Sequence, residues 1–160
     1  MKKCILRIVF LVIIIVISGI IFGFSAQDGE ESGNLSKTVI TKIADILNVE
    51  ENSRENFIET GEVVIRKLAH FTIYTALGMA TIAFLLTFNL KKNIQIISTI
   101  IWGFLYASTD ELHQMFSSGR HASFLDVLLD TSGVIFGIII VILIVYIYKK
   151  VSHNVYSNYK

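Results

Sequence analysis

The chain has no proline among its 160 residues and only one cysteine, Cys4. A single cysteine cannot form an intramolecular disulfide, so cysteine usage excludes a disulfide framework and says nothing about the redox compartment. The sequence has no internal repeat and no low-complexity segment. It also lacks His-Glu-x-x-His, a P-loop, Gly-x-Ser-x-Gly and paired cysteines, so the familiar enzyme classes that use these motifs have no support.

What the chain has in abundance is apolar sequence: 53% of it is hydrophobic. A soluble core of this size does not need so much, which favours a membrane protein. About 20 apolar residues cross a bilayer as a helix, and four runs reach that length. We expect spans at residues 8–26, 68–88, 94–113 and 127–148. The predicted fold class is all-α, an integral membrane four-helix transmembrane bundle forming a single domain over residues 1–160.

Two alternatives are weighed against this prediction. Burial of all four runs as ordinary core helices is the less favoured one. The first run also resembles a cleaved signal peptide, but its apolar stretch is longer than the usual 7–15 residues and residues 23–25 are a poor cleavage signature.

The charges are segregated along the chain. With the N-terminus inside, the cytoplasmic pieces are residues 1–7, residues 89–93 and the tail from Lys149, which hold eight basic residues and no acid. All thirteen acids then fall on the outer side or at the outer helix ends. The positive-inside rule therefore predicts that both termini are cytoplasmic.

The outer segment, residues 27–65, is the only long polar stretch and is expected to be an extracytoplasmic helical loop between the first and second spans. Ser36 predicts the start of a short amphipathic helix, and Asn52 or Ser53 predicts the start of a second helix that runs on into the second span. The segment is either a solvated loop on the bilayer surface or a cap folded over the polar groups described next. The predicted apolar side of the first helix comprises Val39, Ile40, Ile43, Ile46 and Leu47.

Counting about 20 residues from each cytoplasmic anchor places polar groups of all four spans at one outer level. This agreement predicts a functional site at the outer membrane face. For a single residue such as Lys67 or Asp126, anchoring a helix end is the simpler interpretation. The predicted binding residues are Ser25, Gln27, Arg66, Lys67, His70, Tyr74, Asp110, Glu111, Gln114, Arg120, Asp126 and Asp130.

Helical spacing assigns these residues to faces. Arg66, His70 and Tyr74 are four apart and share one side of the second span. A carboxylate at membrane depth costs several kcal/mol unless it is paired or hydrated, so Asp110 and Asp130 need partners. The candidate partners are Arg66, Lys67 and Arg120.

The third and fourth spans carry the carboxylates. Asp110, His113 and Gln114 share a face of the third span, and Glu111 is expected to pair with Gln114 at a spacing of three. Asp126 and Asp130 share a face of the fourth span, where Gly133 and Gly137 form a G-x-x-x-G that predicts close helix packing.

Several kinds of chemistry are open to these residues. His70 or His113 beside a carboxylate can act as a general base, and the catalytic candidates are His70, Asp110, Glu111 and His113. The same four can in principle hold a metal ion, but their spacing matches no familiar pattern, so no metal site and no cofactor are predicted. Basic residues at this level suit the phosphate or carboxylate of a lipid head group.

With these residues in view, the chain resembles the VanZ-like family of bacterial membrane proteins. The resemblance rests on Phe-Ser-Ala-Gln at 24–27, Arg-Lys-Leu-Ala-His-Phe at 66–71 with Tyr74 and Gly78, and Ser-Thr-Asp-Glu-Leu-His-Gln at 108–114. It also rests on Gly119-Arg120, Asp126-Val127 and Gly133. The resemblance implies a multi-pass protein of the bacterial cytoplasmic membrane, in a family named after a member that gives resistance to teicoplanin. It implies no particular reaction.

Two functions remain open. One is a binding protein for a cell-envelope lipid, a lipid-linked wall precursor or a lipoglycopeptide, with a possible contribution to glycopeptide (teicoplanin) resistance. The other is an enzyme that modifies an envelope lipid or lipid-linked precursor through the outer-face His/Asp/Arg cluster. The expected partners are the bilayer and such a ligand, with no nucleic acid. A transporter is disfavoured because the membrane midplane lacks polar residues.

Overall fold

A computed structural model describes residues 2–27, 29–116 and 123–158 of the chain. Over these ranges it contains helices and connecting loops and no strand, so the all-α prediction is confirmed. The helices are α1 (Lys2–Ser25), α2 (Gly29–Ile46), α3 (Glu51–Leu86), α4 (Lys92–Gln114) and α5 (Phe124–Asn158).

Three of the described helices are long and apolar enough to cross a membrane: α1, α3 and α5. In α1 only 6% of the apolar window is buried inside the protein. Ile5, Ile8 and Ile15 are each about 60% exposed. An apolar surface of this kind is unfavourable in water and favourable against lipid. These are the helices of a membrane protein. The third predicted span, residues 94–113, coincides with α4, but α4 is not among the three, and the four-span bundle is not established by length and composition alone.

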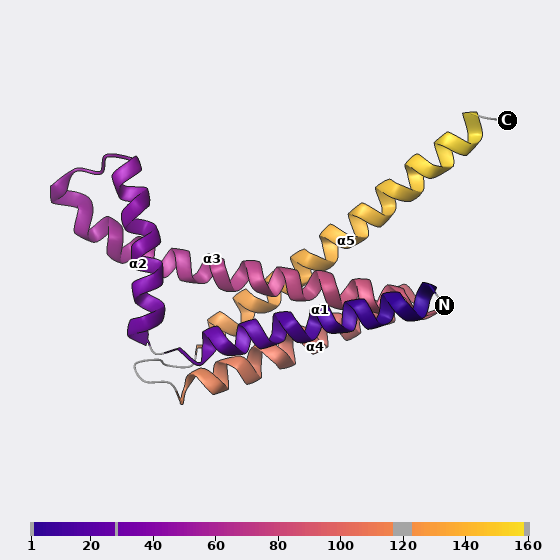
Figure 1. Ribbon diagram of the computed structural model, residues 1–160, viewed down its shortest axis with the longest axis horizontal. Coiled ribbons are helices and arrows are strands. Elements are labelled where there is room, and N and C mark those ends of the chain that lie inside the picture. Colours follow the sequence, from indigo (N-terminus) through magenta and orange to yellow (C-terminus); the bar gives the residue numbers. More distant parts are fainter. Residues whose placement is uncertain (1, 28, 117–122, 159–160) are drawn as a thin grey trace.

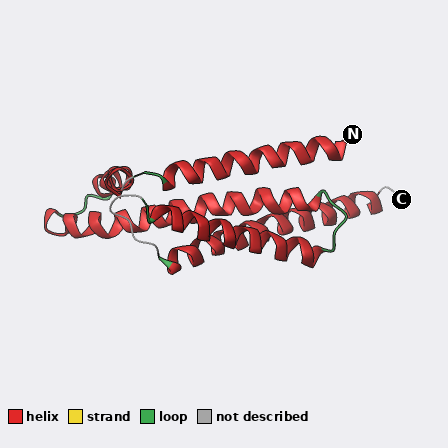
Figure 2. Cartoon of the chain, turned by 90° about the horizontal axis from the view of Figure 1, so that it is seen from below, coloured by secondary structure: helices red, strands yellow, loops and turns green. Residues whose placement is uncertain are grey.

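Helices α1, α3 and α4 run along one another, α5 crosses them at an angle, and α2 lies across one end. Figures 1 and 2 show α1, α3 and α4 side by side, with α5 crossing α3 and α2 turned away from the common direction. The C-terminal ends of α1 and α4 and the N-terminal end of α5 lie at the same end of the bundle as α2. Side chains from four segments can therefore meet there.

Glycines bring α3 and α5 together almost backbone to backbone. A Cβ added to Gly133 of α5 would lie 2.6 Å from the carbonyl oxygen of Phe71 in α3. Cβ atoms at Gly137 and at Gly78 would likewise meet the backbone of the opposite helix. Close packing through the G-x-x-x-G pair is confirmed, and small residues are how membrane helices approach most closely.

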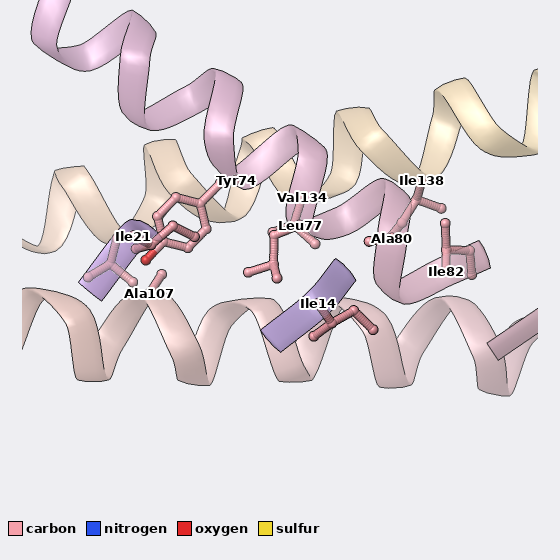
Figure 3. Packing of buried hydrophobic residues seen from close by; sticks show 10 residues of the cluster. Ile14, Ile21, Tyr74, Leu77, Ala80, Ile82, Ala107, Val134 and Ile138 are labelled. Carbon is pink, nitrogen blue, oxygen red and sulfur yellow. The ribbon is translucent and has the colours of Figure 1, made fainter. Parts of the chain in front are cut away.

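The apolar core lies between these helices. Tyr74 and Leu77 of α3 are fully buried, and they pack with Val134 of α5 and Ala107 of α4 (Figure 3). Ile21 of α1 closes the core on the remaining side. Tyr74 therefore brings a phenol into an otherwise apolar core at the end of the bundle where the polar groups gather.

The outer segment is mostly helical, as the prediction of a helical loop requires, with α2 covering Gly29–Ile46. The second predicted helix does run unbroken into its span as α3, which is confirmed. The predicted start at Ser36 is wrong, because α2 already begins at Gly29 and Ser36 is buried inside it.

The predicted apolar face of α2 is also partly wrong. Ile46 and Leu47 are 77% and 62% exposed, and the buried face instead contains Gly33, Ser36, Ile40 and Ala44. The reason is close packing on α3. A Cβ at Gly61 of α3 would collide with Ile40, so the small residues decide which side of α2 faces inward.

Candidate functional site

A group of buried polar side chains fills the end of the bundle where α1 and α4 end and α5 begins. We call it the polar cluster. Asp130 is 2% exposed, Asp110 is 5% exposed, and Ser25 and Tyr74 are completely buried. All its members were predicted as site residues: Ser25, His70, Tyr74, Asp110, Gln114 and Asp130.

The centre of the polar cluster is a histidine between two carboxylates. One potential metal-ligand atom from each of His70, Asp110 and Asp130 lies within 4.8 Å of the other two. Nδ1 of His70 is 3.7 Å from Oδ2 of Asp130, which is ion-pair range when the imidazole is protonated. These three side chains come from α3, α4 and α5, so packing of all three helices sets their separation.

Asp110 also has uncharged polar neighbours. Gln114, one turn further along α4, donates a hydrogen bond of 3.2 Å from Nε2 to Oδ2 of Asp110. The side chains of Ser25 and Tyr74 also border this carboxylate. Among the described residues, Asp110 thus has Gln114 as its partner and not Arg66, contrary to the prediction.

Lys67 forms an ion pair with a carboxylate other than the predicted Asp110 and Asp130. Its Nζ lies 3.3 Å from Oδ1 of Asp126, and both side chains are more than one-third exposed. Asp130, one turn deeper in α5, is approached by His70 instead. Successive helical residues point about 100° apart, so Lys67 and Arg66 cannot both face α5.

Glu111 and His113 lie outside the polar cluster. Oε1 of Glu111 accepts a 2.5 Å hydrogen bond from the backbone N–H of Ser123, which ties the end of α4 to the start of α5. The predicted Glu111–Gln114 pair is therefore wrong. The ring of His113 makes a tilted contact with the ring of Phe22 in α1, with centroids 4.4 Å apart, so His113 faces a different neighbour from Asp110.

Beside the polar cluster lies a cavity of about 250 Å³ between α1, α2 and α3, which we call the groove. Its lining is mainly apolar, and the described residues that line it include no carboxylate. Phe24, Leu35 and Val39 at its edge are about half exposed, so the groove opens outward. His70 belongs both to the groove and to the polar cluster. The lining residues are Ile21, Phe24, Gln27, Leu35, Ser36, Val39, Ile65, Arg66, Ala69, His70 and Ile73.

Three predicted site residues thus line the groove: Gln27, Arg66 and His70. Arg120 lies outside the described residues. The sequence analysis missed the part of α2 that walls the groove, Leu35 and Val39, because nothing in a local pattern tells which helix α2 packs against. The exposed rows of glutamates on α3 border a separate cavity together with Lys37 and Arg54.

The two sites together define a class of protein: a helical membrane protein with a buried histidine–carboxylate cluster beside an apolar groove that carries one arginine. The sequence model of the VanZ/LLP1 family matches residues 10–145, and the chain belongs to this family. No curated protein and no solved structure shows significant similarity to the chain.

Proposed function

We propose that this protein binds an anionic molecule with an acyl or prenyl chain in the groove, at the outer face of a bacterial cytoplasmic membrane. The observation that carries the proposal is the lining of the groove, which is apolar along most of its wall. Its polar residues are Gln27, Ser36, Arg66 and His70. Binding sites for apolar ligands usually have this form, in which a few polar groups fix the orientation.

The size of the groove limits what enters it. At about 250 Å³ it is smaller than the roughly 300–1,000 Å³ that drug-sized ligands occupy. It suits one hydrocarbon chain, with the head group left at the rim. The guanidinium of Arg66 can bind a phosphate or carboxylate there through paired N–H donors. An envelope lipid, a lipid-linked wall precursor and a lipoglycopeptide all carry such a chain and such a group.

In the membrane arrangement that we propose, α4 crosses the membrane in addition to α1, α3 and α5. Ile97, Ile101 and Leu105, four residues apart, are each more than half exposed and form an apolar stripe suited to lipid. The polar residues that lower the hydropathy of α4, such as Gln95 and Thr99, are buried against its neighbours. The distribution of basic residues then supports both termini in the cytoplasm and the polar cluster at the outer face.

Binding is tested with purified protein in detergent and a fluorescent phosphatidylglycerol. The matching phosphatidylcholine, which is zwitterionic and carries no net charge, serves as the comparison. We expect preference for the anionic lipid, weakened about tenfold or more by Arg66→Gln because a charge-assisted hydrogen bond contributes about 1.5–3 kcal/mol. Lys42→Gln removes the same charge from an exposed position on α2 and is the matched control. Ala69→Phe fills the groove and should weaken both lipids. Equal effects of Arg66→Gln and Lys42→Gln would contradict a specific role for Arg66.

A contribution to glycopeptide resistance follows if the natural ligand is a wall precursor or the antibiotic itself. The test is teicoplanin and vancomycin susceptibility of a bacterial host expressing wild type, Asp110→Asn or Arg66→Gln at matched membrane levels. Protection by wild type that the substitutions abolish supports this role. Unchanged susceptibility with every version rejects the resistance role and leaves lipid binding to the assay above.

A second candidate function is an enzyme acting on an envelope lipid. The observation in its favour is His70, which contacts Asp130 and lines the groove where a ligand would lie. A histidine beside a carboxylate can accept a proton from an attacking water or hydroxyl. Asp110→Asn separates the two functions: binding should survive in part, whereas turnover of a lipid-linked substrate should be lost.

A further inference from the structure

The polar cluster holds two buried carboxylates, and among the described residues no lysine or arginine pairs with either of them. Asp110 and Asp130 are at least 95% buried, and Lys67 pairs with the more exposed Asp126. Within the described ranges, neither Asp110 nor Asp130 forms an ion pair with a lysine or arginine. Burying ionised carboxylates without compensation is strongly unfavourable.

One atom of this group stands out. Oδ1 of Asp130 is buried and has no hydrogen-bond partner among the residues that the structure describes. Buried carboxylate oxygens are normally hydrogen-bonded, paired or bound to a metal ion. Since Oδ2 of the same carboxylate faces His70, the unpartnered oxygen lies within a group that already has three potential ligands.

The geometry suits a single small ion after a modest contraction. With metal–ligand bonds of about 2.1 Å, the 3.7 Å between Nδ1 of His70 and Oδ2 of Asp130 gives a ligand–metal–ligand angle of about 125°. The widest pair, within 4.8 Å, must close by up to about 0.6 Å, since two ligands of one ion are at most about 4.2 Å apart. Because the three ligands come from α3, α4 and α5, this contraction draws these helices together.

We propose that His70, Asp110 and Asp130 bind one divalent transition-metal ion, Zn²⁺ or Mn²⁺. One imidazole with two carboxylates suits these ions better than Ca²⁺ or Mg²⁺, which prefer oxygen ligands alone. Gln114, hydrogen-bonded to Asp110, orients that ligand, as outer-shell residues of metal sites do. From sequence spacing alone we predicted no metal site, and the proposal reverses that prediction. It also goes beyond lipid binding, which needs no metal.

Three protein ligands leave coordination positions open for water or for a ligand oxygen. His70 is about one-quarter exposed and lines the groove, so the open side of the ion would face the groove. A phosphate held at the rim by Arg66 could then reach the metal. The groove would then bind the hydrocarbon chain of a ligand, and the metal ion would bind its phosphate.

The test uses the full chain purified in detergent, with any histidine tag removed because a tag binds the same ions. After EDTA treatment the protein is dialysed against Zn²⁺ or Mn²⁺, and bound metal is counted by mass spectrometry. We expect about one ion per chain for wild type and Asp126→Asn, and a loss of tenfold or more in affinity for Asp130→Asn and His70→Gln. Asp126→Asn is the matched control, since it removes a carboxylate one turn away on the same helix.

Binding by wild type no greater than by Asp130→Asn would overturn the proposal, as would equal loss in Asp126→Asn. If the ligand variants fail to fold, Co²⁺ added to wild type decides instead. Visible absorption bands that EDTA removes, with a raised unfolding temperature, support the site. Absence of both would overturn the proposal.

Discussion

Gly133→Ala is the sharpest test of the packing that positions Asp130. The new Cβ would lie 2.6 Å from the carbonyl oxygen of Phe71 and 3.3 Å from the backbone nitrogen of Thr75. A normal C···O contact is about 3.3 Å, so α5 must move away from α3 by about 0.7 Å. Overpacking of this kind costs about 1–3 kcal/mol, which exceeds the helix-propensity gain of about 0.5–1 kcal/mol from replacing glycine by alanine. We expect a net destabilisation of about 1–2 kcal/mol.

The assay is thermal unfolding in detergent, followed by the fluorescence of Trp102, the only tryptophan. Trp102 stacks with Tyr106, whose hydroxyl donates to the carbonyl oxygen of Ser18 at 2.7 Å, so its emission reports packing of α4 on α1. Gly19→Ala is the matched control, because its Cβ would meet nothing within 4 Å. Gly19→Ala should be neutral or slightly stabilising. Equal unfolding temperatures for the two variants would refute the close α3–α5 contact.

Other predictions follow from single contacts. Lys67→Gln and Asp126→Asn should each cost less than about 1 kcal/mol, and the double variant should show weak coupling, because exposed ion pairs contribute little; a large coupling energy would contradict the exposed geometry. Tyr106→Phe should lower stability by about 1 kcal/mol through loss of the hydrogen bond to Ser18, measured as the unfolding midpoint. Ile40→Ala should loosen α2 from α3 and speed proteolysis within residues 47–50 without lowering the global unfolding temperature; unchanged cleavage would show that Ile40 does not hold α2.

Much of the fold could be predicted because apolar run length and helical period are local properties. The positions of all four long helices follow from the sequence, and so does the continuity of α3 through the outer segment into its span. The inward face of α2 could not be predicted. It depends on the glycine at position 61 of a different helix, and tertiary packing of small residues overrides the apolar pattern of Val39, Ile46 and Leu47.

Counting residues along each helix predicts how deep a site residue lies in the membrane, but not which neighbouring helix its side chain faces. Depth was enough to expect His70, Asp110 and Asp130 at one level, and the structure places them together. The partner of each charged side chain depends on the direction in which that side chain leaves the helix. Successive residues of an α-helix differ in this direction by about 100°. That is why Lys67 was assigned to the wrong carboxylates, while its actual partner is Asp126.

The groove required the three-dimensional arrangement. Its wall combines α1, α2 and α3, and α2 reaches it only by lying across the end of the bundle (Figure 1). Leu35 and Val39 carry no signal in the sequence that separates them from any other exposed apolar residue. Arg66, in contrast, was expected at this level from its spacing to His70.

Groove occupancy is the central claim, and photocrosslinking in membranes tests it most directly. An anionic phospholipid with a diazirine in its acyl chain is incorporated into vesicles with the full chain, irradiated, and the attachment sites are mapped by mass spectrometry. We predict attachment concentrated at Leu35, Val39 and Ile73, and reduced by Arg66→Gln but not by Lys42→Gln. Attachment spread evenly over the lipid-exposed residues of α1 and α5, and unchanged by Arg66→Gln, would contradict the account.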